Sequence, residues 1–208
     1  TDLNRYPDGN ASAFKEKVAS SFDVLPTMVT VGNGSNDIIE FIAKCFLSSG
    51  DTAIYSKHGF AIYPLAIKAS GAEAIKVEAK NWGHDLEAMA DAIQENTKVI
   101  FIASPNNPTG TALTLKEIEK FLTKIPDDIV VLIDQAYFEY VENEEFKVPF
   151  KLVEKFKNLI ISRSFSKAHG LAAFRLGFSI SSEEIADYLN RVRPVSYTHL
   201  RAHETPIN

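Results

Sequence analysis

The sequence has little cysteine and no long apolar run. Cys45 is the only cysteine among 208 residues, which excludes an internal disulfide framework and a cysteine-rich metal site. No stretch stays apolar over the roughly 20 residues that a membrane-spanning helix needs. The opening residues, TDLNRYPDGN, lack the basic and then apolar layout of a secretory signal. We therefore expect a cytoplasmic protein with no membrane partner, in which Cys45 is a packed thiol.

Positive charge is also scarce. Lysine and arginine number 22 against 27 acidic residues, and a net charge of -5 offers no basic surface to attract nucleic acid. The chain is 45% hydrophobic and 24% charged, a composition typical of a globular protein with a sizeable core. Repeats, low-complexity tracts and long linkers are absent as well, so nothing divides the chain into independent modules.

Short β-branched runs alternate with amphipathic segments along the chain. The runs predict strands over residues 52–56, 73–79, 98–103, 129–134, 158–162 and 175–181. Apolar residues at helical spacing follow from Ile38, from Leu86 and from Ile118, and each series predicts a helix with one core-facing side. Strands joined through helices indicate a three-layer α/β/α fold with a mostly parallel sheet.

The three predicted helices also carry start signals. Ser35 suits the N-cap of the first helix and Asp85 that of the second. Thr114 and Glu117 have the spacing of a capping box before the third. In such a fold the ligand crevice lies beyond the carboxyl ends of the strands, so polar residues that follow a predicted strand are candidates for a binding site.

Four polar segments fall at such positions. SPNNPTG follows the strand at 98–103, DQAYFEY contains the end of the strand at 129–134, and RSFSK follows the run NLIIS; TVGNGSND adds a glycine-bearing turn at a helix start. Taken singly, each has an ordinary explanation as a turn, a cap or a solvated charge. Their joint placement at one edge of the sheet favours a binding site.

Individual residues within these segments suggest chemistry. Asp134 closes an apolar run, where an ionised carboxylate costs several kcal/mol unless a cation or strong donors meet it. A helix cap or bonds to backbone amides would be a plainer role for it. Tyr137 alone would be a packing residue, and Lys167 alone a surface charge. Arg175 and the GNGSND turn suit an anion such as phosphate, while the missing glycine fingerprint argues against a dinucleotide.

Together, SPNNPTG, DQAY and SFSKAHGLAAFRLG, in this order and spacing, resemble the pyridoxal-phosphate aminotransferases of fold type I. RYPDG near the start and HGFAIYPLA most resemble the histidinol-phosphate aminotransferases within that group. The resemblance covers roughly residues 3–194. It implies the large cofactor domain of these enzymes, with an incomplete N-terminal arm and the small domain largely missing.

The resemblance implies a role for each polar residue. Lys167 would bond covalently to the cofactor aldehyde and later carry a proton, and Asp134 would face the protonated pyridine nitrogen. Tyr137 and Asn107 would hydrogen-bond the phenolic oxygen of the ring. The cofactor phosphate would be held by Arg175, Ser164, Ser166, Gly34, Ser35 and Asn36.

Two aromatic residues complete the implied site. Phe60 would stack on the cofactor ring, where relatives often carry tyrosine. Tyr6 would reach the cofactor phosphate of a neighbouring subunit, which implies a homodimer with shared active sites. No metal is implied, since HETPI near the end lacks the second histidine of a zinc motif.

The implied reaction is transfer of an amino group from L-histidinol phosphate to 2-oxoglutarate, a step of histidine biosynthesis. An aromatic or broad-specificity aminotransferase and an enzyme like phosphothreonine decarboxylase remain alternatives. A ligand-sensing domain built on the same fold is the non-enzymatic one. Ser164 to Lys167 also matches the S-x-x-K pattern of serine acyl-transfer enzymes, but its companion motifs are missing.

The chain departs from the family pattern in three places. Gln135 and Asp37 each stand where many relatives have glutamate. The chain stops before the part of the small domain that usually supplies an arginine for the substrate, so we expect this fragment to be inactive by itself. Residues 195–208, VSYTHLRAHETPIN, have no apolar period and no cap, and we expect them to be a non-native tail on the domain formed by residues 1–194.

Overall fold

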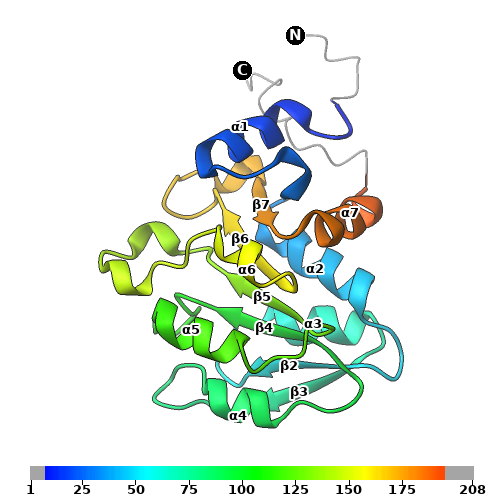
Figure 1. Ribbon diagram of the computed structural model, residues 1–208, viewed down its shortest axis with the longest axis vertical. Helices are drawn as coiled ribbons and strands as arrows, with labels where there is room; N and C mark the ends of the chain where they lie inside the picture. The colour runs from blue at the N-terminus through cyan, green and yellow to red at the C-terminus, as the bar shows by residue number, and fades with distance from the viewer. Residues whose placement is uncertain (1–7, 195–208) are drawn as a thin grey trace.

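The computed structural model describes residues 8–194, and within them a seven-stranded sheet forms the centre of the molecule (Figure 1). The strand order is β1-β7-β6-β5-β4-β2-β3. The strands are β1 (Val29–Gly32), β2 (Thr52–Ser56), β3 (Glu73–Val77), β4 (Thr97–Ala103), β5 (Val130–Asp134), β6 (Leu159–Ser164) and β7 (Gly177–Ile180). Strands β2 to β6 pair in parallel, and β7 runs antiparallel to both β6 and β1. The prediction of a mostly parallel sheet is confirmed.

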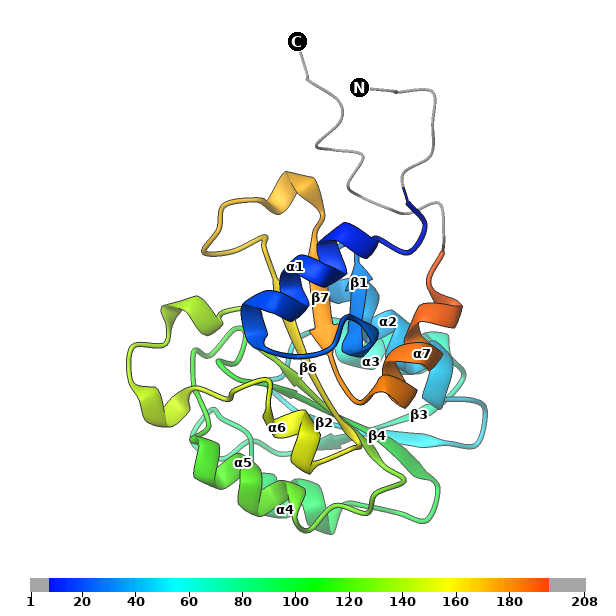
Figure 2. The same cartoon turned by 45° about the horizontal axis from the view of Figure 1, so that its top comes forward.

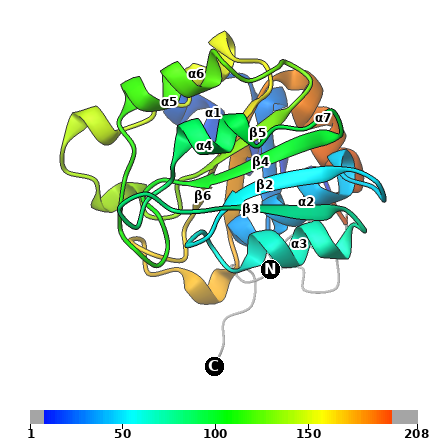
Figure 3. The same ribbon diagram turned by 90° about the horizontal axis from the view of Figure 1, so that it is seen from below.

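Helices cover both faces of the sheet, as the view from below in Figure 3 shows. One face carries α1 (Ser12–Phe22), α4 (Leu86–Asp91), α5 (Leu115–Leu122) and α6 (Leu152–Lys155). The other carries α2 (Ser35–Phe46), α3 (Ile62–Ala69) and α7 (Glu183–Val192). Short 3₁₀ helices are η1 (Pro26–Met28), η2 (Phe138–Tyr140), η3 (Glu144–Phe146) and η4 (Ala172–Phe174). The three-layer arrangement predicted from the sequence is confirmed.

The central strands divide their side chains between two cores. On β5, Val131 and Ile133 pack under α1, α5 and α6, while Val130 and Leu132 pack under α2 and α3. This alternation follows from the period of two along a strand. It decides which face each polar residue at a strand end reaches, and it places Asp134 on the α2 and α3 side.

Two of the three predicted helix caps are confirmed. Asp85 accepts a hydrogen bond from the backbone of Ala88 at 3.1 Å, and Thr114 and Glu117 form the capping box. The Ser35 cap is wrong, because Gly34 is the N-cap and Ser35 is the first residue of α2. The backbone at the cap has φ 86°, a conformation that glycine adopts without strain and serine does not.

The strand β1 was not predicted: the segment TVGNGSND was expected to form a glycine-bearing turn at a helix start, and its first residues belong to β1. The four residues of β1 are all buried, and among the described strands it pairs with β7 alone, from Val29 opposite Ile180 to Gly32 opposite Gly177. Cys45 is half-buried, its thiol donates to the Tyr188 carbonyl at 3.3 Å, and burial raises its pKa to about 11. It is therefore a protonated, packed thiol, as expected.

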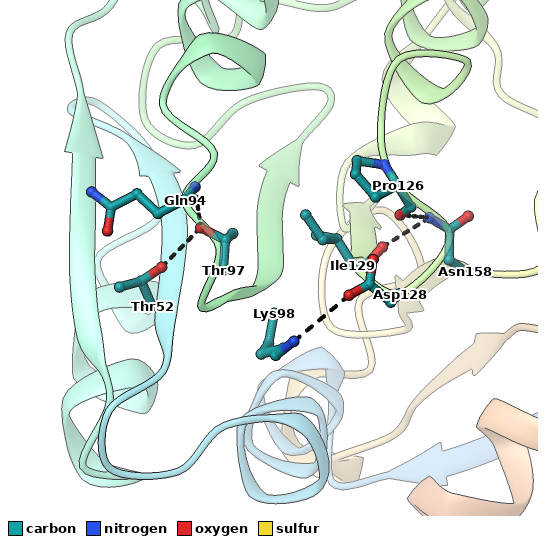
Figure 4. Close-up of polar contacts among 8 residues, drawn as sticks. All are labelled: Thr52, Gln94, Thr97, Lys98, Pro126, Asp128, Ile129 and Asn158. Atoms are coloured by element: carbon teal, nitrogen blue, oxygen red, sulfur yellow. Dashed lines mark hydrogen bonds and ion pairs between the residues drawn. The ribbon is translucent and has the colours of Figure 1, made fainter.

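Polar contacts close the amino ends of the parallel strands (Figure 4). The Asn158 amide donates to the carbonyls of Ile129 at 2.8 Å and Pro126 at 3.2 Å. The hydroxyls of Thr52 and Thr97 share a hydrogen bond of 2.9 Å. Buried polar groups at this edge thus have partners within the fold, as folded proteins require.

None of the helices within residues 8–194 is long and apolar enough to span a membrane.

Candidate functional site

The carboxyl ends of the strands surround a pocket at the opposite edge. In Figure 2 the segments that follow β5 and β6 leave the sheet at this same end. The pocket is lined by Gly34, Ser35, Asn36, Phe60, Ala103, Pro105, Asn107, Asp134, Ala136, Tyr137, Ser164, Ser166, Lys167 and Arg175. Every residue predicted from the sequence to contact a cofactor is in this group except Tyr6, which lies outside the described residues. The polar segments predicted to converge do so.

Asp134 is the most deeply buried ionisable residue of the pocket, with 4% of its surface exposed. The Ser162 hydroxyl donates to one carboxylate oxygen at 3.0 Å, and the Tyr63 hydroxyl donates to the other at 3.3 Å. Burial raises the pKa of Asp134, and these two donors, the backbone N–H of Ala136 and the charge of Lys167 oppose the rise. Within residues 8–194 the carboxylate makes no ion pair, so its partners are neutral donors.

The sequence reasoning missed both of these hydroxyl donors. Ser162 could have been found, because the period of two on β6 places it on the same face as Ser164. Tyr63 carried no such signal, since its helix was not predicted. Tyr63 is fully buried, its ring stacks on Phe101 with centroids 5.1 Å apart, and burial beside Asp134 raises its pKa well above the usual value. Its hydroxyl therefore stays protonated and keeps donating.

Lys167 lies in an exposed turn directly after β6. The backbone N–H of Ser166 donates to the Ser164 hydroxyl at 3.1 Å, and that of Gly170 donates to the Lys167 carbonyl at 2.9 Å. These bonds hold the turn that presents the lysine to the pocket. Its ammonium nitrogen lies 5.3 Å from the ring centroid of Tyr137, which follows the end of β5.

Arg175 forms the far wall of the pocket, beside the start of α2. Its guanidinium donates to the Asn33 carbonyl at 2.8 Å, the Ala172 carbonyl at 3.0 Å and the Ser166 hydroxyl at 3.3 Å. A Cβ atom at Gly34 would lie 2.7 Å from this guanidinium. Glycine leaves room for this approach and also adopts the φ of 86° found there without strain. A guanidinium beside the N-terminus of a helix forms an anion-binding corner.

The remaining predicted residues line the space between these groups. Phe60 precedes α3 and is half-buried, with its ring edge-on to Tyr63 at 5.8 Å. Asn107 is half-buried in the loop after β4. The pocket thus has a buried carboxylate in its floor, a cationic anion-binding corner, an amine and an aromatic wall. These groups suit a flat ligand that carries a protonated ring nitrogen, a phosphate and a carbonyl.

A wider hollow lies between α4 and α5, lined by Lys80, His84, Asp85, Glu117 and others. Its acidic side chains are already engaged, because Asp85 and Glu117 cap these two helices. His84 is buried and bonded to the Ala103 backbone. Its lining includes Lys80, Lys120 and Lys124 but no arginine, so this hollow has no counterpart of the corner that Arg175 forms beside the start of α2.

Comparisons with known proteins agree with this geometry. The family model described as aminotransferase class I and II matches residues 1–204. A histidinol-phosphate aminotransferase of Hydrogenovibrio crunogenus is 48% identical over 200 residues, covering 96% of this chain and 54% of its own. One of Mannheimia succiniciproducens is 52% identical over 192 residues, covering 92% of this chain and 52% of its own.

A solved structure has the same fold. The histidinol-phosphate aminotransferase of Sinorhizobium meliloti, in complex with pyridoxal-5'-phosphate, superposes with a TM-score of 0.90 at 24% identity. It matches 97% of this chain and 55% of that one. The chain therefore spans about half the length of the relatives it matches.

The buried carboxylate leads to a prediction for the ligand-free chain. We expect Asp134→Asn to raise the free energy of unfolding by about 1–3 kcal/mol at about pH 8, because the amide removes the buried charge. The amide oxygen can still accept from Ser162, and its nitrogen can donate to Tyr63. Urea unfolding of both chains across a pH series measures the effect.

The sign of the pH dependence follows from the raised pKa. The folded chain favours the neutral, protonated form of Asp134, because its pKa is raised. Below the pKa of unfolded aspartate, about 3.9, both states are protonated and the side chain costs no stability. As the pH rises from there through the folded pKa, ionisation of Asp134 lowers the free energy of unfolding. The advantage of the variant must therefore shrink toward acid pH. Asp127→Asn, at an exposed position, is the matched control. Equal stability of wild type and Asp134→Asn at about pH 8 would contradict the account.

Proposed function

Because this chain belongs to the family of class I and II aminotransferases, we propose that it is the cofactor-binding part of a pyridoxal-phosphate-dependent aminotransferase. The observation that carries the proposal is one pocket in which a buried carboxylate, an accessible lysine and an arginine beside a helix start converge. Pyridoxal phosphate has the matching groups: a basic ring nitrogen, an aldehyde and a phosphate.

The residues of the pocket fit this cofactor. Asp134 has a raised pKa and lacks an ion-pair partner within residues 8–194, and it would gain one in a protonated pyridine nitrogen. Arg175, Ser164, Ser166 and the start of α2 at Gly34, Ser35 and Asn36 would hold the phosphate. Phe60 would cover the ring, and Tyr137 and Asn107 would hydrogen-bond its phenolic oxygen. Lys167 would bond to the aldehyde carbon.

When bound, the cofactor supplies an electron sink for the bonds at the substrate's α carbon. The chain's own residues do the rest. Asp134 would keep the ring nitrogen protonated, which is the state in which the ring withdraws electrons best. Lys167 would act as the base that accepts the proton of the substrate's α carbon and as the acid that gives it back. The anion-binding corner would hold the cofactor phosphate and so fix the ring relative to the Lys167 amine.

We propose L-histidinol phosphate as the amino donor and 2-oxoglutarate as the acceptor, a step in histidine biosynthesis. This proposal is supported by sequence identities of 48% and 52% to relatives named histidinol-phosphate aminotransferases. A homodimer with shared active sites, in which Tyr6 reaches the partner's cofactor phosphate, belongs to the same proposal. We also propose a cytoplasmic location. We further propose that residues 1–194 form the large domain and that residues 195–208, which lie outside the described residues, are a non-native tail.

The first test concerns Lys167. We expect the chain incubated with pyridoxal phosphate and then reduced with borohydride to carry a stable label on Lys167, located by peptide mapping. Lys167→Arg keeps the charge but has no amine able to form the bond, so it must lose both the label and the visible absorption band. A label on another lysine, with Lys167 unmodified, would refute the assignment.

The second test concerns the substrate. A version extended to the length of the relatives should transfer the amino group of histidinol phosphate with a kcat/KM at least about tenfold above that for phenylalanine, since one well-placed charged contact is worth that much. Steady-state rates with histidinol phosphate, phenylalanine and phosphothreonine measure it. Preference for phenylalanine would make the protein an aromatic aminotransferase. Loss of carbon dioxide from phosphothreonine would make it a decarboxylase.

A further inference from the structure

Arg163 is a buried charged residue that the proposed mechanism does not use. It lies on β6 between Ser162, which bonds Asp134, and Ser164, which lines the pocket. Alternation along the strand sends its side chain to the opposite face of the sheet. Only 9% of its surface is exposed. A buried guanidinium is costly unless its surroundings compensate it, so its contacts need an explanation.

Aromatic rings surround the guanidinium of Arg163. Its central carbon lies 3.4 Å from the ring centroid of Phe138, 4.6 Å from that of Phe150 and 5.4 Å from that of Phe22. These rings come from α1, from η2 after β5 and from the segment before α6. Arginine stacked on aromatic faces gains cation–π energy, most of all where water is excluded. Arg163 thus contacts three segments on the face of the sheet opposite to the side chains of Ser162 and Ser164.

Arg163 also contacts Gln135, the residue that follows Asp134 in the chain. The Arg163 Nε donates to the Gln135 side-chain oxygen at 3.3 Å, and the Gln135 amide nitrogen donates to the Val148 carbonyl at 3.1 Å. The backbone N–H of Gln135 donates to the Ser162 carbonyl at 2.9 Å. Gln135 is fully buried, so it has no water to replace these partners. The side chain of Arg163 therefore ties the end of β5 to the end of β6.

The charge of Arg163 has one acidic partner within residues 8–194. A carboxylate oxygen of Glu139 lies 3.9 Å from its Nη1, while Gln135 offers a neutral amide. Burial lowers the pKa of Arg163 to about 10, which leaves it charged at neutral pH. Glu139 also lies 3.4 Å from the ring of His169, two residues beyond Lys167. Glu139 thus contacts both Arg163 and the segment that follows Lys167.

We propose that Arg163 is a positioning residue for the cofactor site, with Glu139 as its counter-ion. Held in its aromatic cage and bonded to Gln135, it fixes Asp134, Ser162 and Ser164 from behind the sheet. The charge on Glu139 keeps the guanidinium in that place. The inference rests on the proposed function, because its consequence is the affinity for pyridoxal phosphate.

Removing the counter-charge tests the inference. Glu139→Gln removes the acidic charge, whereas Glu139→Asp keeps that charge on a side chain one methylene shorter. We expect Glu139→Gln to raise the dissociation constant for pyridoxal phosphate at least about fivefold, and Glu139→Asp to leave it within about twofold of wild type. Arg163→Met should raise it at least about tenfold. Glu142→Gln, at an exposed position nearby, is the matched control and should change nothing.

The affinities are measured by absorbance under conditions in which circular dichroism shows each variant folded. A merely structural role would lower the free energy of unfolding and leave the dissociation constant of the folded chain unchanged. Failure of the wild-type chain to bind pyridoxal phosphate would refute the proposed function itself. If wild type binds, an unchanged dissociation constant in Glu139→Gln, or a Glu139→Asp variant no better than Glu139→Gln, would overturn the positioning role of Arg163.

Discussion

The carboxylate of Asp134, buried at the end of β5 with no ion-pair partner among residues 8–194, is the constraint on which the rest of the site depends. Hydroxyls from Tyr63 and Ser162 hold its two oxygens, and burial still raises its pKa. Neutral donors make such a group tolerable in a folded chain but leave it short of charge compensation. In the proposed function, the protonated ring nitrogen of the cofactor would remove that deficit.

The fold holds this carboxylate in place from both sides of the sheet. The strand period sends Asp134 and Ser162 to the side of α2 and α3, and Arg163 to the side of α1 and α6. Polar contacts such as those of Asn158 close the amino ends of the strands, so the carboxyl ends remain for the ligand. Glycine at position 34 admits the guanidinium of Arg175 to the start of α2, which completes the anion-binding corner. Each of these features depends on strands that lie far apart in the sequence.

Local rules predicted much of this arrangement, and pairing between distant segments accounts for what they missed. Strand ends followed by SPNNPTG, DQAY and SFSK predicted the pocket, since parallel strands must end at one edge. Asp85 and Thr114 were identified as caps because a cap depends on only four residues. Ser35 was wrongly assigned because its neighbour Gly34 takes a positive φ beside Arg175. The short strand β1 was missed because β7, with which it pairs, lies far away along the chain. The aromatic cage of Arg163 was missed for the same reason, and Tyr63 was missed because α3 was not predicted.

The most direct test is a titration of the Asp134 side-chain carboxyl carbon by NMR, in the free chain and with pyridoxal phosphate bound. The account predicts a pKa above the ordinary aspartate value in the free chain, because burial outweighs the neutral donors. It predicts a marked fall when the cofactor brings its ring nitrogen to the carboxylate. An ordinary pKa in the free chain, or the same pKa in both states, would contradict it.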